Sequence, residues 1–482
     1  MSRASVVVVG AGVSGLAAAW ELSGGAKGPD ERTPRIEVIE ASDTFGGSLQ
    51  TTTFAGRTID LGADGFLARR QEAVTLVDEL GLSDQLEAIS ASGAWLWSRG
   101  DLHELPAGLV LGVPTNQKAL SRFKGISWRG RLAARRDVVL PARLQLSDDA
   151  TIGEIVRRKL GRELTYQLIE PMIGGIQAGR IDELSAKSVF PALFDAALKG
   201  GSLSRALRSP TPVIPGPSVE TTSGGPAFFT LVEGVGSLPH ELARQLVERG
   251  VVLRHGVGVT ALRRTPAGNY PWEVDTLNTT TPANAIVLAA PAPVVGALIG
   301  SHDPALEELR QIESAGAAMV TFALAKSEIT LPPTGTGILV PLRSAWKGGG
   351  SLMVTAVTLL DRKWPHLARD NDVVLRAHVG RSDDSRWTEL TNEELVHRVA
   401  QELNELLPRF GTALESLVQR WPNGLPQYRV GHEARVQRAR VASARISVAL
   451  AGNAYDGVGI PASIGSGRRA ARSLLSVINP SP

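Results

Sequence analysis

The feature that most constrains the fold is a glycine motif close to the amino terminus. A β-branched run, Val6–Val9, is followed by Gly10-Ala11-Gly12-Val13-Ser14-Gly15 and then by an apolar helical pattern over residues 16–22. A second segment rich in β-branched residues, Ile36–Ile39, is followed by an acid, Glu40, 25 positions after the last glycine of the motif. A strand, a glycine turn, a helix and a second strand ending in an acid predict a nucleotide-binding βαβ unit.

Each part of this motif has a physical role in binding a dinucleotide. The first glycine allows the tight turn, the second lets the backbone approach a pyrophosphate, and the third lets helix and strand pack closely. The helix offers free N–H groups and the positive end of its dipole to the phosphates. Glu40 is expected to accept hydrogen bonds from ribose hydroxyls. NAD and FAD both bind in this way, so the motif alone leaves the cofactor open.

Further glycine-rich segments favour an extended cofactor. Gly46-Gly47-Ser48 follows the acidic strand end, and Asp60–Phe66 (DLGADGF) comes shortly after it. Near the carboxyl terminus, Ala451–Gly459 places several glycines between a strand and a helix. A helix that begins there directs its positive end at the turn, and if the cofactor is a flavin, this charge would stabilise the anionic reduced ring.

Composition excludes several classes of site. The 482 residues contain no cysteine, which excludes disulfide scaffolds, thiolate metal sites, iron–sulfur clusters, a cysteine nucleophile and a cysteinyl-linked flavin. The net charge of +3 does not indicate a nucleic-acid binder. The eight histidines show no ligand spacing, so no metal is expected. The apolar stretch Ile286–Gly300 contains two prolines and is shorter than the roughly 18 residues of a membrane span, and we expect a cytoplasmic protein.

Two segments in the middle of the chain have unusual compositions. Lys118–Arg143 contains eight Lys and Arg against one acid, Asp137. This favours a solvated helical face, and it also suits a basic rim for an anionic substrate or a contact with an anionic membrane. Arg208–Pro226 is rich in proline and glycine and predicts a loop or linker.

Several longer segments are similar to a known family. They include Gly62–Arg70 (GADGFLARR), Pro171–Ser185 (PMIGGIQAGRIDELS), Trp421–His432 (WPNGLPQYRVGH) and the terminal GVGIPASIGSG. Nearly end to end, the chain resembles the protoporphyrinogen/coproporphyrinogen oxidase family within the flavin amine oxidase superfamily, and most of all its soluble Gram-positive coproporphyrinogen III oxidases. It departs from the family at Thr44, where Arg is usual, and at Gln177, where Tyr or Phe is usual.

The resemblance implies an α/β fold with discontinuous domains. A Rossmann-like FAD-binding domain of the glutathione-reductase or amine-oxidase type would combine residues 1–75, 226–298 and 420–482. A mixed-sheet substrate-binding domain would comprise residues 76–108 and 299–419. Residues 109–225 would form a mainly helical domain. The substrate cavity is expected where these domains meet.

The resemblance also implies which residues surround a non-covalent FAD. Gly175 would lie in the loop that lines the substrate face of the flavin. Substrate propionates need cations, and Arg69, Arg70 and Arg180 are the candidates, each with a surface ion pair as its alternative role. No side chain is assigned as a catalytic acid or base, because flavin N5 carries the chemistry. The residues expected to bind FAD are Gly10, Ala11, Gly12, Val13, Ser14, Gly15, Glu40, Ala41, Gly47, Ser48, Gly62, Ala63, Asp64, Gly65, Val259, Trp421, Val458, Gly459 and Ile460.

The implied activity is the six-electron oxidation of coproporphyrinogen III to coproporphyrin III in haem biosynthesis, with three O₂ reduced to three H₂O₂. Oxidation of protoporphyrinogen IX is the nearest alternative. A flavin amine oxidase and a non-catalytic FAD- or porphyrin-binding protein are two further alternatives. Beyond the tetrapyrrole and O₂, peripheral contact with a membrane or with a haem-pathway protein stays open, as does the oligomeric state.

Overall fold

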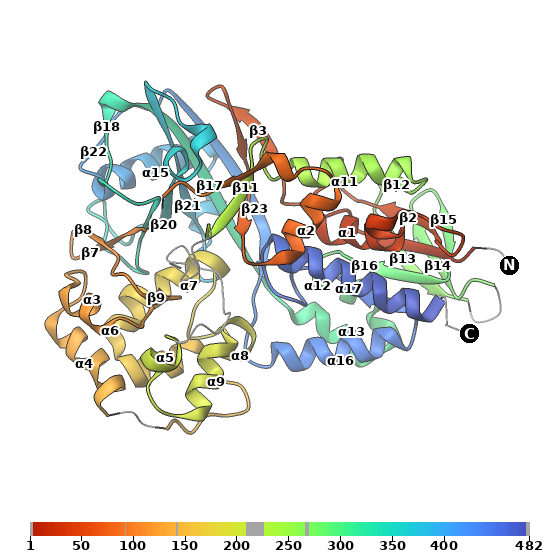
Figure 1. Cartoon of the computed structure of the whole chain (residues 1–482), viewed down its shortest axis with the longest axis horizontal. Coiled ribbons are helices and arrows are strands. Elements are labelled where there is room, and N and C mark those ends of the chain that lie inside the picture. The colour runs from red at the N-terminus through yellow and green to blue at the C-terminus, as the bar shows by residue number, and fades with distance from the viewer. Residues whose placement is uncertain (1–2, 92, 141–142, 209–225, 266–268, 479–482) are drawn as a thin grey trace.

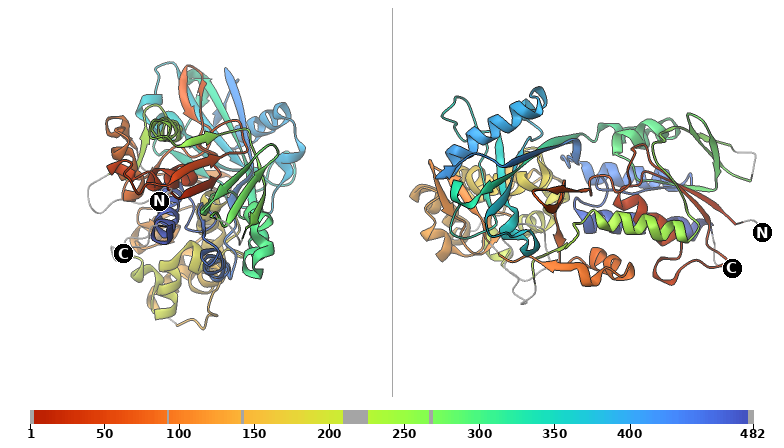
Figure 2. Two further views of the ribbon diagram at one scale, coloured as in Figure 1. Left: turned by 90° about the vertical axis from the view of Figure 1, so that its right-hand side faces the viewer. Right: turned by 90° about the horizontal axis from the view of Figure 1, so that it is seen from above.

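The computed structural model describes residues 3–91, 93–140, 143–208, 226–265 and 269–478, so most of the linker expected at 208–226 lies outside the described residues. The molecule is elongated. A parallel sheet with its helices occupies one end, and a mixed sheet and a group of helices occupy the other (Figures 1 and 2).

The predicted βαβ unit forms the centre of a five-stranded parallel sheet. Along its first strand, β1, the side chains alternate between two apolar layers, with Val6 and Val8 in one and Val7 and Val9 in the other. Both faces are covered, which is why the strand is a continuous apolar run. In spatial order the strands are β12 (Val252–Arg254), β2 (Arg35–Ile39), β1 (Ser5–Val9), β16 (Ala285–Leu288) and β24 (Val448–Leu450).

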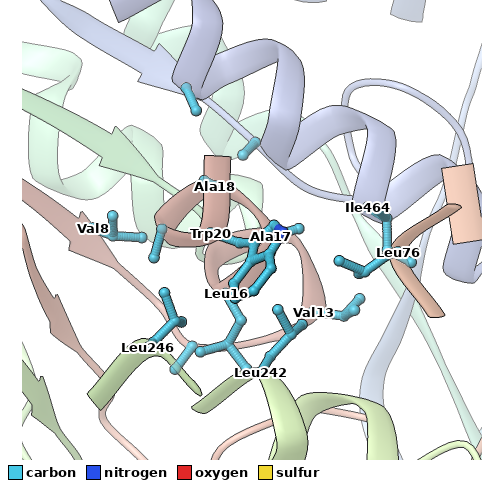
Figure 3. Close-up of a cluster of buried hydrophobic side chains, with 14 of the residues drawn as sticks. Val8, Val13, Leu16, Ala17, Ala18, Trp20, Leu76, Leu242, Leu246 and Ile464 are labelled. Atoms are coloured by element: carbon cyan, nitrogen blue, oxygen red, sulfur yellow. The ribbon is translucent and has the colours of Figure 1, made fainter. Parts of the chain in front are cut away.

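Helices cover one face of this sheet. Trp20 is fully buried among leucines of neighbouring helices, including Leu242 and Leu246 (Figure 3). Two of the helices approach each other closely at Gly467, where an added Cβ would overlap the backbone carbonyl of Ser14. The helices are α1 (Val13–Leu22), α2 (Gln71–Glu79), α11 (Ser237–Glu248) and α17 (Ile460–Ile478).

The opposite face of the parallel sheet packs against a small antiparallel sheet and three helices, in the Rossmann-like arrangement that the sequence predicts. These elements are β13 (Val259–Arg264), β14 (Trp272–Thr276), β15 (Thr280–Ala283), α12 (Ala292–Ile299), α13 (Pro304–Glu307) and α16 (His432–Ala444).

A seven-stranded mixed sheet dominates the other end of the molecule. Helix α15 (Asn392–Leu406) packs against one face through Leu395, Val399 and Leu403. Met319 and His378 lie opposite each other in the register of two central strands and face a cavity on the other side. All neighbouring strands of this sheet are antiparallel except the β19/β7 pair. In spatial order the strands are β23 (Glu415–Pro426), β17 (Ser314–Ala325), β21 (Asp372–Val379), β20 (Val354–Leu359), β19 (Gly337–Leu339), β7 (Trp95–Ser98) and β8 (Asp101–Glu104).

The third part of the molecule is helical and has its own apolar cluster. A π-helical turn, Thr165–Ile169, leads directly into the helix that reaches the cavity, and such turns are frequent at functional sites. The helices are α3 (Gln117–Arg122), α4 (Trp128–Val139), α5 (Ile152–Leu160), α6 (Arg162–Leu164), α7 (Glu170–Gln177), α8 (Ala186–Val189), α9 (Pro191–Lys199) and α10 (Leu203–Ala206).

Short elements connect these parts. They are β3 (Thr51–Phe54), β4 (Arg57–Asp60), β5 (Phe66–Leu67), β6 (Leu86–Ala88), β9 (Leu109–Val110), β10 (Val113–Pro114), β11 (Phe228–Leu231), β18 (Ile329–Thr330), α14 (Leu360–Lys363) and β22 (Arg409–Phe410).

Three of the expected domain boundaries fall inside elements. Position 75 lies in α2, 298 in α12 and 420 in β23. The residues of α2 pack with the parallel-sheet core, and β23 pairs with β17 from Glu415 to Pro426. We therefore propose that the three-part division holds, with these boundaries moved to the ends of the elements.

Candidate functional site

The glycines of the amino-terminal turn differ in what surrounds them. Gly10 has a φ of +99°, and an added Cβ would lie 2.7 Å from the carbonyl oxygen of Ala289. At Gly15 a Cβ would overlap the carbonyl of Gly10, so this glycine serves helix–strand packing. At Gly12 no described atom lies within 4 Å of the Cβ position, so the space beside the backbone is open to a ligand.

The amino terminus of α1 is available to an anion. Its N-cap residue, Gly12, provides no side-chain cap, so the backbone N–H groups of the first turn stay available to donate hydrogen bonds to a ligand. The second glycine segment is held against this turn because the Gly46 N–H donates to the Ala11 carbonyl at 2.8 Å. A Cβ on Gly47 would lie 3.3 Å from the Cα of Gly12.

Glu40 lies at the carboxyl end of β2 beside the glycine turn. Its Oε2 accepts the Ala11 N–H at 2.6 Å, and its Oε1 accepts the N–H and hydroxyl of Ser42 at 2.8 and 2.7 Å. Ala41 follows it, and Val259 begins the nearby strand β13. Their roles in binding the ribose and adenine ends of the cofactor stay a prediction.

A cavity of about 480 Å³ lies where the parallel sheet, the mixed sheet and α7 meet. Its lining is mainly apolar, with Met172 and Ile176 from α7 and Leu339 from β19. Turns far apart in the sequence converge on it. The sequence-predicted residues that line it are Val13, Ser48, Gly62, Ala63, Asp64, Gly175, Trp421, Val458, Gly459 and Ile460.

Thr358, Lys363 and His378 are among the polar residues of this cavity that sequence reasoning missed. Lys363 Nζ donates to Asp64 Oδ1 at 2.7 Å, and His378 Nε2 lies 3.0 Å from Thr358 Oγ1. Lys363 ends α14, and the other two residues lie on β20 and β21. No motif marks them. Strand alternation groups residues by face, but it does not reveal which sheet face borders a cavity.

The charges behind the cavity have a consistent pattern. Arg376 is buried, and it donates to the backbone carbonyls of Asp60 and Gly62. Burial opposes ionisation of Asp64, but Lys363 and Arg376 outweigh it and lower the pKa of Asp64 to about 2. Burial and the nearby Arg376 lower the pKa of His378 to about 4. At neutral pH the cavity therefore presents a carboxylate–ammonium pair and a neutral imidazole.

Asp60 behaves differently from Asp64. Burial, with the neighbouring charge of Asp64, raises the pKa of Asp60 to about 7 despite Arg376. One of its side-chain oxygens has no hydrogen-bond partner among the described residues. Two aspartates four positions apart thus carry different charges near neutral pH.

The candidate arginines lie outside this cavity. Arg70 pairs with Glu72 at 2.8 Å, and Arg180 lies 3.3 Å from Asp383 and 3.8 Å from Asp182. Arg69 is exposed. Their role in binding propionates stays a prediction.

Several other expected residues also lie beside the cavity rather than in its lining. A Cβ on Gly65 would lie 2.6 Å from the Trp364 ring, so this glycine serves packing. Ser14 is buried, with its backbone against Gly467 of α17. Gln177 is also buried, and its carbonyl accepts the side-chain N–H of Gln427 at 2.8 Å.

The residues present fit FAD. The amino termini of α1 and α17 both reach the cavity region through Val13 and Ile460. Neither Gly12 nor Gly459 has a described atom within 4 Å of its Cβ position, so both helix starts leave room for a ligand. Trp421 lines the cavity and is held in place because its Nε1 donates to the Leu61 carbonyl at 3.1 Å.

Comparison with known proteins gives a consistent result. A model of the flavin containing amine oxidoreductase family matches residues 13–475. The coproporphyrinogen III oxidase of Bacillus subtilis (strain 168) is 32% identical over 476 residues, with 98% of each chain covered. The protoporphyrinogen oxidase of Macaca fascicularis is 28% identical over 491 residues, with 98% of each chain covered. A crystal structure from Exiguobacterium sp. 255-15, assigned as a protoporphyrinogen oxidase, has a TM-score of 0.85 and 30% identity and covers 98% of this chain and 99% of that one.

The family match extends over all residues that line the cavity, from Val13 to Ser463. FAD is the cofactor, and the protein is an FAD-dependent oxidoreductase. No helix within the described ranges combines the length and apolarity needed to cross a bilayer. Because the family model matches almost the whole chain and a full-length relative is 32% identical, the chain belongs to the flavin containing amine oxidoreductase family.

Proposed function

We propose that this enzyme oxidises coproporphyrinogen III to coproporphyrin III. The proposal is supported by the full-length relative of that name and is carried by one structural observation, the cavity of about 480 Å³ between the glycine turns and the mixed sheet. When bound, FAD supplies the hydride acceptor, and O₂ takes up its electrons.

The cavity walls suit the apolar pyrrole rings of the macrocycle. Met172, Ile176 and Leu339 provide apolar surface that burial of the tetrapyrrole would remove from water. Gly175 has no described atom within 4 Å of its Cβ position, so the backbone of α7 leaves space for a ring system. On the other side, Val458–Ile460 place the positive end of the α17 dipole at the cavity.

The polar groups of the cavity have roles in orientation. The oxidation removes pyrrole N–H protons as well as hydrides. His378 stays neutral near pH 7, so its imidazole keeps a lone pair that can accept a hydrogen bond from a pyrrole N–H. Lys363 is held by Asp64 and carries the positive charge on this wall.

Parallel turnover assays test this proposal. Purified holoenzyme is supplied aerobically with coproporphyrinogen III or protoporphyrinogen IX, and porphyrin fluorescence is followed. We expect a higher kcat/KM for the four-propionate substrate. If neither porphyrinogen is oxidised faster than in the absence of enzyme, the proposal is wrong, and product analysis with amines then tests the amine oxidase alternative.

Protoporphyrinogen IX oxidation is a second candidate that one observation favours. Among the described residues that line the cavity, Lys363 is the one cation, which suits a substrate with fewer carboxylates. The Macaca relative and the Exiguobacterium structure carry that name. A higher kcat/KM for protoporphyrinogen IX in the same assay would select this activity.

We also propose that the enzyme works in the cytoplasm. Supporting this, the amino-terminal apolar run Val6–Val9 is the central strand of the parallel sheet, bonded to β2 and β16. Cell fractionation with flavin fluorescence as the readout tests the location.

A further inference from the structure

A second cavity, of about 470 Å³, lies beside the start of β20 and the end of β21, two central strands of the seven-stranded sheet. It is formed by residues within three segments, 341–343, 351–355 and 381–386. Its lining is polar and includes three guanidinium groups, those of Arg343, Arg381 and Arg386. Neither the oxidation chemistry nor the cofactor site uses these residues.

The two cavities share structural elements. Along β20, Thr355 lines the second cavity and Ala356 the first. On the other side, the Nη1 of Arg381 lies 3.0 Å from the Cβ position of Gly174, and the next residue, Gly175, lines the first cavity. The second cavity is therefore adjacent to the proposed tetrapyrrole cavity.

The carboxylates of the second cavity already have partners. Asp384 pairs with Arg386 at 2.5 Å, and Asp383 lies 3.3 Å from Arg180. Arg386 also donates to the Ser351 carbonyl at 3.1 Å, and this hydrogen bond links two of the segments that form the cavity. Among the described residues, Arg343 and Arg381 form no ion pair with either aspartate, although the charges of both aspartates attract Arg381.

Arg381 is 5% exposed and incompletely satisfied. Its Nη2 donates to the Val340 carbonyl at 3.3 Å, whereas Nη1 has no hydrogen-bond partner among the described residues. The nearest carboxylate oxygen, Oε1 of Glu170, is 3.9 Å away, beyond hydrogen-bonding distance. Burial also raises the pKa of Glu170 to about 7, which weakens it as a counterion. A buried guanidinium in this state favours a nearby anion.

Arg343 is the accessible cation of this cavity. It is exposed, and it has no hydrogen-bond or ion-pair partner among the described residues. Its φ of +61° lies in the left-handed region, which is uncommon for a residue other than glycine. Arginine is the side chain best suited to bind a carboxylate through two parallel hydrogen bonds.

We propose that the second cavity binds carboxylate groups of a propionate-bearing tetrapyrrole, with Arg343 as the accessible anchor and Arg381 as the buried positive charge. This inference rests on the proposed function for the identity of the ligand. The site would hold the acidic edge of a porphyrin next to the reaction cavity, and the number of carboxylates would set how tightly it binds.

Equilibrium titration of the holoenzyme with fluorescent coproporphyrin III tests this site. In Arg343→Gln we expect the affinity to fall roughly tenfold or more, as for the loss of a charged hydrogen bond. The affinity for protoporphyrin IX, which has two propionates, should fall less in Arg343→Gln. Arg343→Lys should restore part of the affinity for coproporphyrin III. Inorganic phosphate and succinate serve as competitors. Weak competition by both supports a tetrapyrrole site, whereas full competition at an equal concentration of anionic groups assigns the site to small anions and overturns the proposal.

Arg99→Gln is the matched control. Arg99 is likewise exposed and has a φ of +60°, but it lies outside the cavity. Unchanged coproporphyrin affinity in Arg343→Gln, or an equal loss in both variants, overturns the proposal. The proposed function fails separately, if the wild-type holoenzyme oxidises neither porphyrinogen, because the titration needs no turnover.

Discussion

At the scale of single residues, the glycines of the amino-terminal turn separate the needs of the fold from those of the ligand. Gly15 is surrounded by backbone, whereas the Cβ position of Gly12 has no described atom within 4 Å. Gly12 also has an ordinary φ of −65°, which any residue can adopt. The same motif therefore contains one position that folding requires and one that we propose the cofactor requires.

Gly12→Val is expected to abolish most flavin binding. The free energy of unfolding of the apoprotein should stay within about 0.5 kcal/mol of wild type. Gly15→Ala is expected to destabilise the apoprotein by more than 1 kcal/mol, because its methyl group overlaps the Gly10 carbonyl. Flavin absorbance and calorimetry of both apoproteins check the pair. Normal flavin content in Gly12→Val would contradict the assignment.

Asp60 makes the stability of the protein depend on pH. Its pKa rises from 3.8 to about 7 on folding, so between these values the folded state binds more protons than the unfolded state. Its contribution to the free energy of unfolding therefore falls as pH rises through this window. Glu170, with a pKa near 7, acts in the same direction, whereas His378 and His432, each lowered to about 4, act in the opposite direction.

Because these contributions oppose each other, the informative quantity is the difference between Asp60→Asn and wild type. Asparagine keeps the shape and does not titrate, so the Tm of the variant relative to wild type should rise between pH 4.5 and pH 7.5. Calorimetry of both apoproteins across this range checks the sign. A difference that is flat with pH, or that falls, would place the pKa of Asp60 near its ordinary value.

At the scale of elements, two helices matter most because their amino termini reach the cavity. α1 and α17 cross closely at Gly467, where a methyl group would overlap the Ser14 carbonyl. An alanine in an isolated helix is about 1 kcal/mol more favourable than glycine. At Gly467 the steric overlap makes alanine less favourable than glycine, because moving the backbone of the neighbouring helix would disrupt its packing.

Gly467→Ala is therefore expected to destabilise the protein by about 1–3 kcal/mol and to weaken flavin binding, because α17 must shift together with Val458–Ile460. Flavin dissociation constants and denaturant unfolding measure the two effects. Thr391→Ala provides the comparison. It removes the capping box of α15, which lies outside the cavity lining, at a cost of about 1 kcal/mol and with flavin affinity retained.

At the scale of the whole molecule, the cofactor region joins segments that are far apart in the chain. The cavity lining combines residues from the amino-terminal turn, α7, the mixed sheet and α17. A ligand that contacts all of them binds the folded state and not the unfolded chain. Binding therefore stabilises the three parts together.

We expect apoprotein prepared by removal of flavin to unfold at a lower temperature than holoenzyme. Free FAD at 100 times its Kd should add about 2.7 kcal/mol to the free energy of unfolding. The expected holoenzyme transition is a single one, because the ligand bridges the parts. Calorimetry at several FAD concentrations checks both, and a Tm independent of FAD would contradict this placement of the site.

The sequence alone determined the features that depend on short-range order. The strand Val6–Val9, the glycine turn, Glu40 and the glycine-rich start of α17 follow from spacing and periodicity within a few residues, and the structure confirms the strand, the turn and the helix. The domain limits are less well predicted, because an element such as β23 belongs to the sheet with which it pairs rather than to its neighbours in the sequence.

Only the tertiary structure decided which polar side chains share the cavity and which arginines do not line it. Lys363 forms an ion pair with Asp64, which lies 299 positions away in the sequence, and Arg180 forms an ion pair with Asp383. Strand pairing in a mixed sheet is non-local: alternation tells which residues share a face, but the order and register of strands determine what that face meets. The sequence therefore determined the glycine turn, whereas packing between distant segments decided which charges line the cavity.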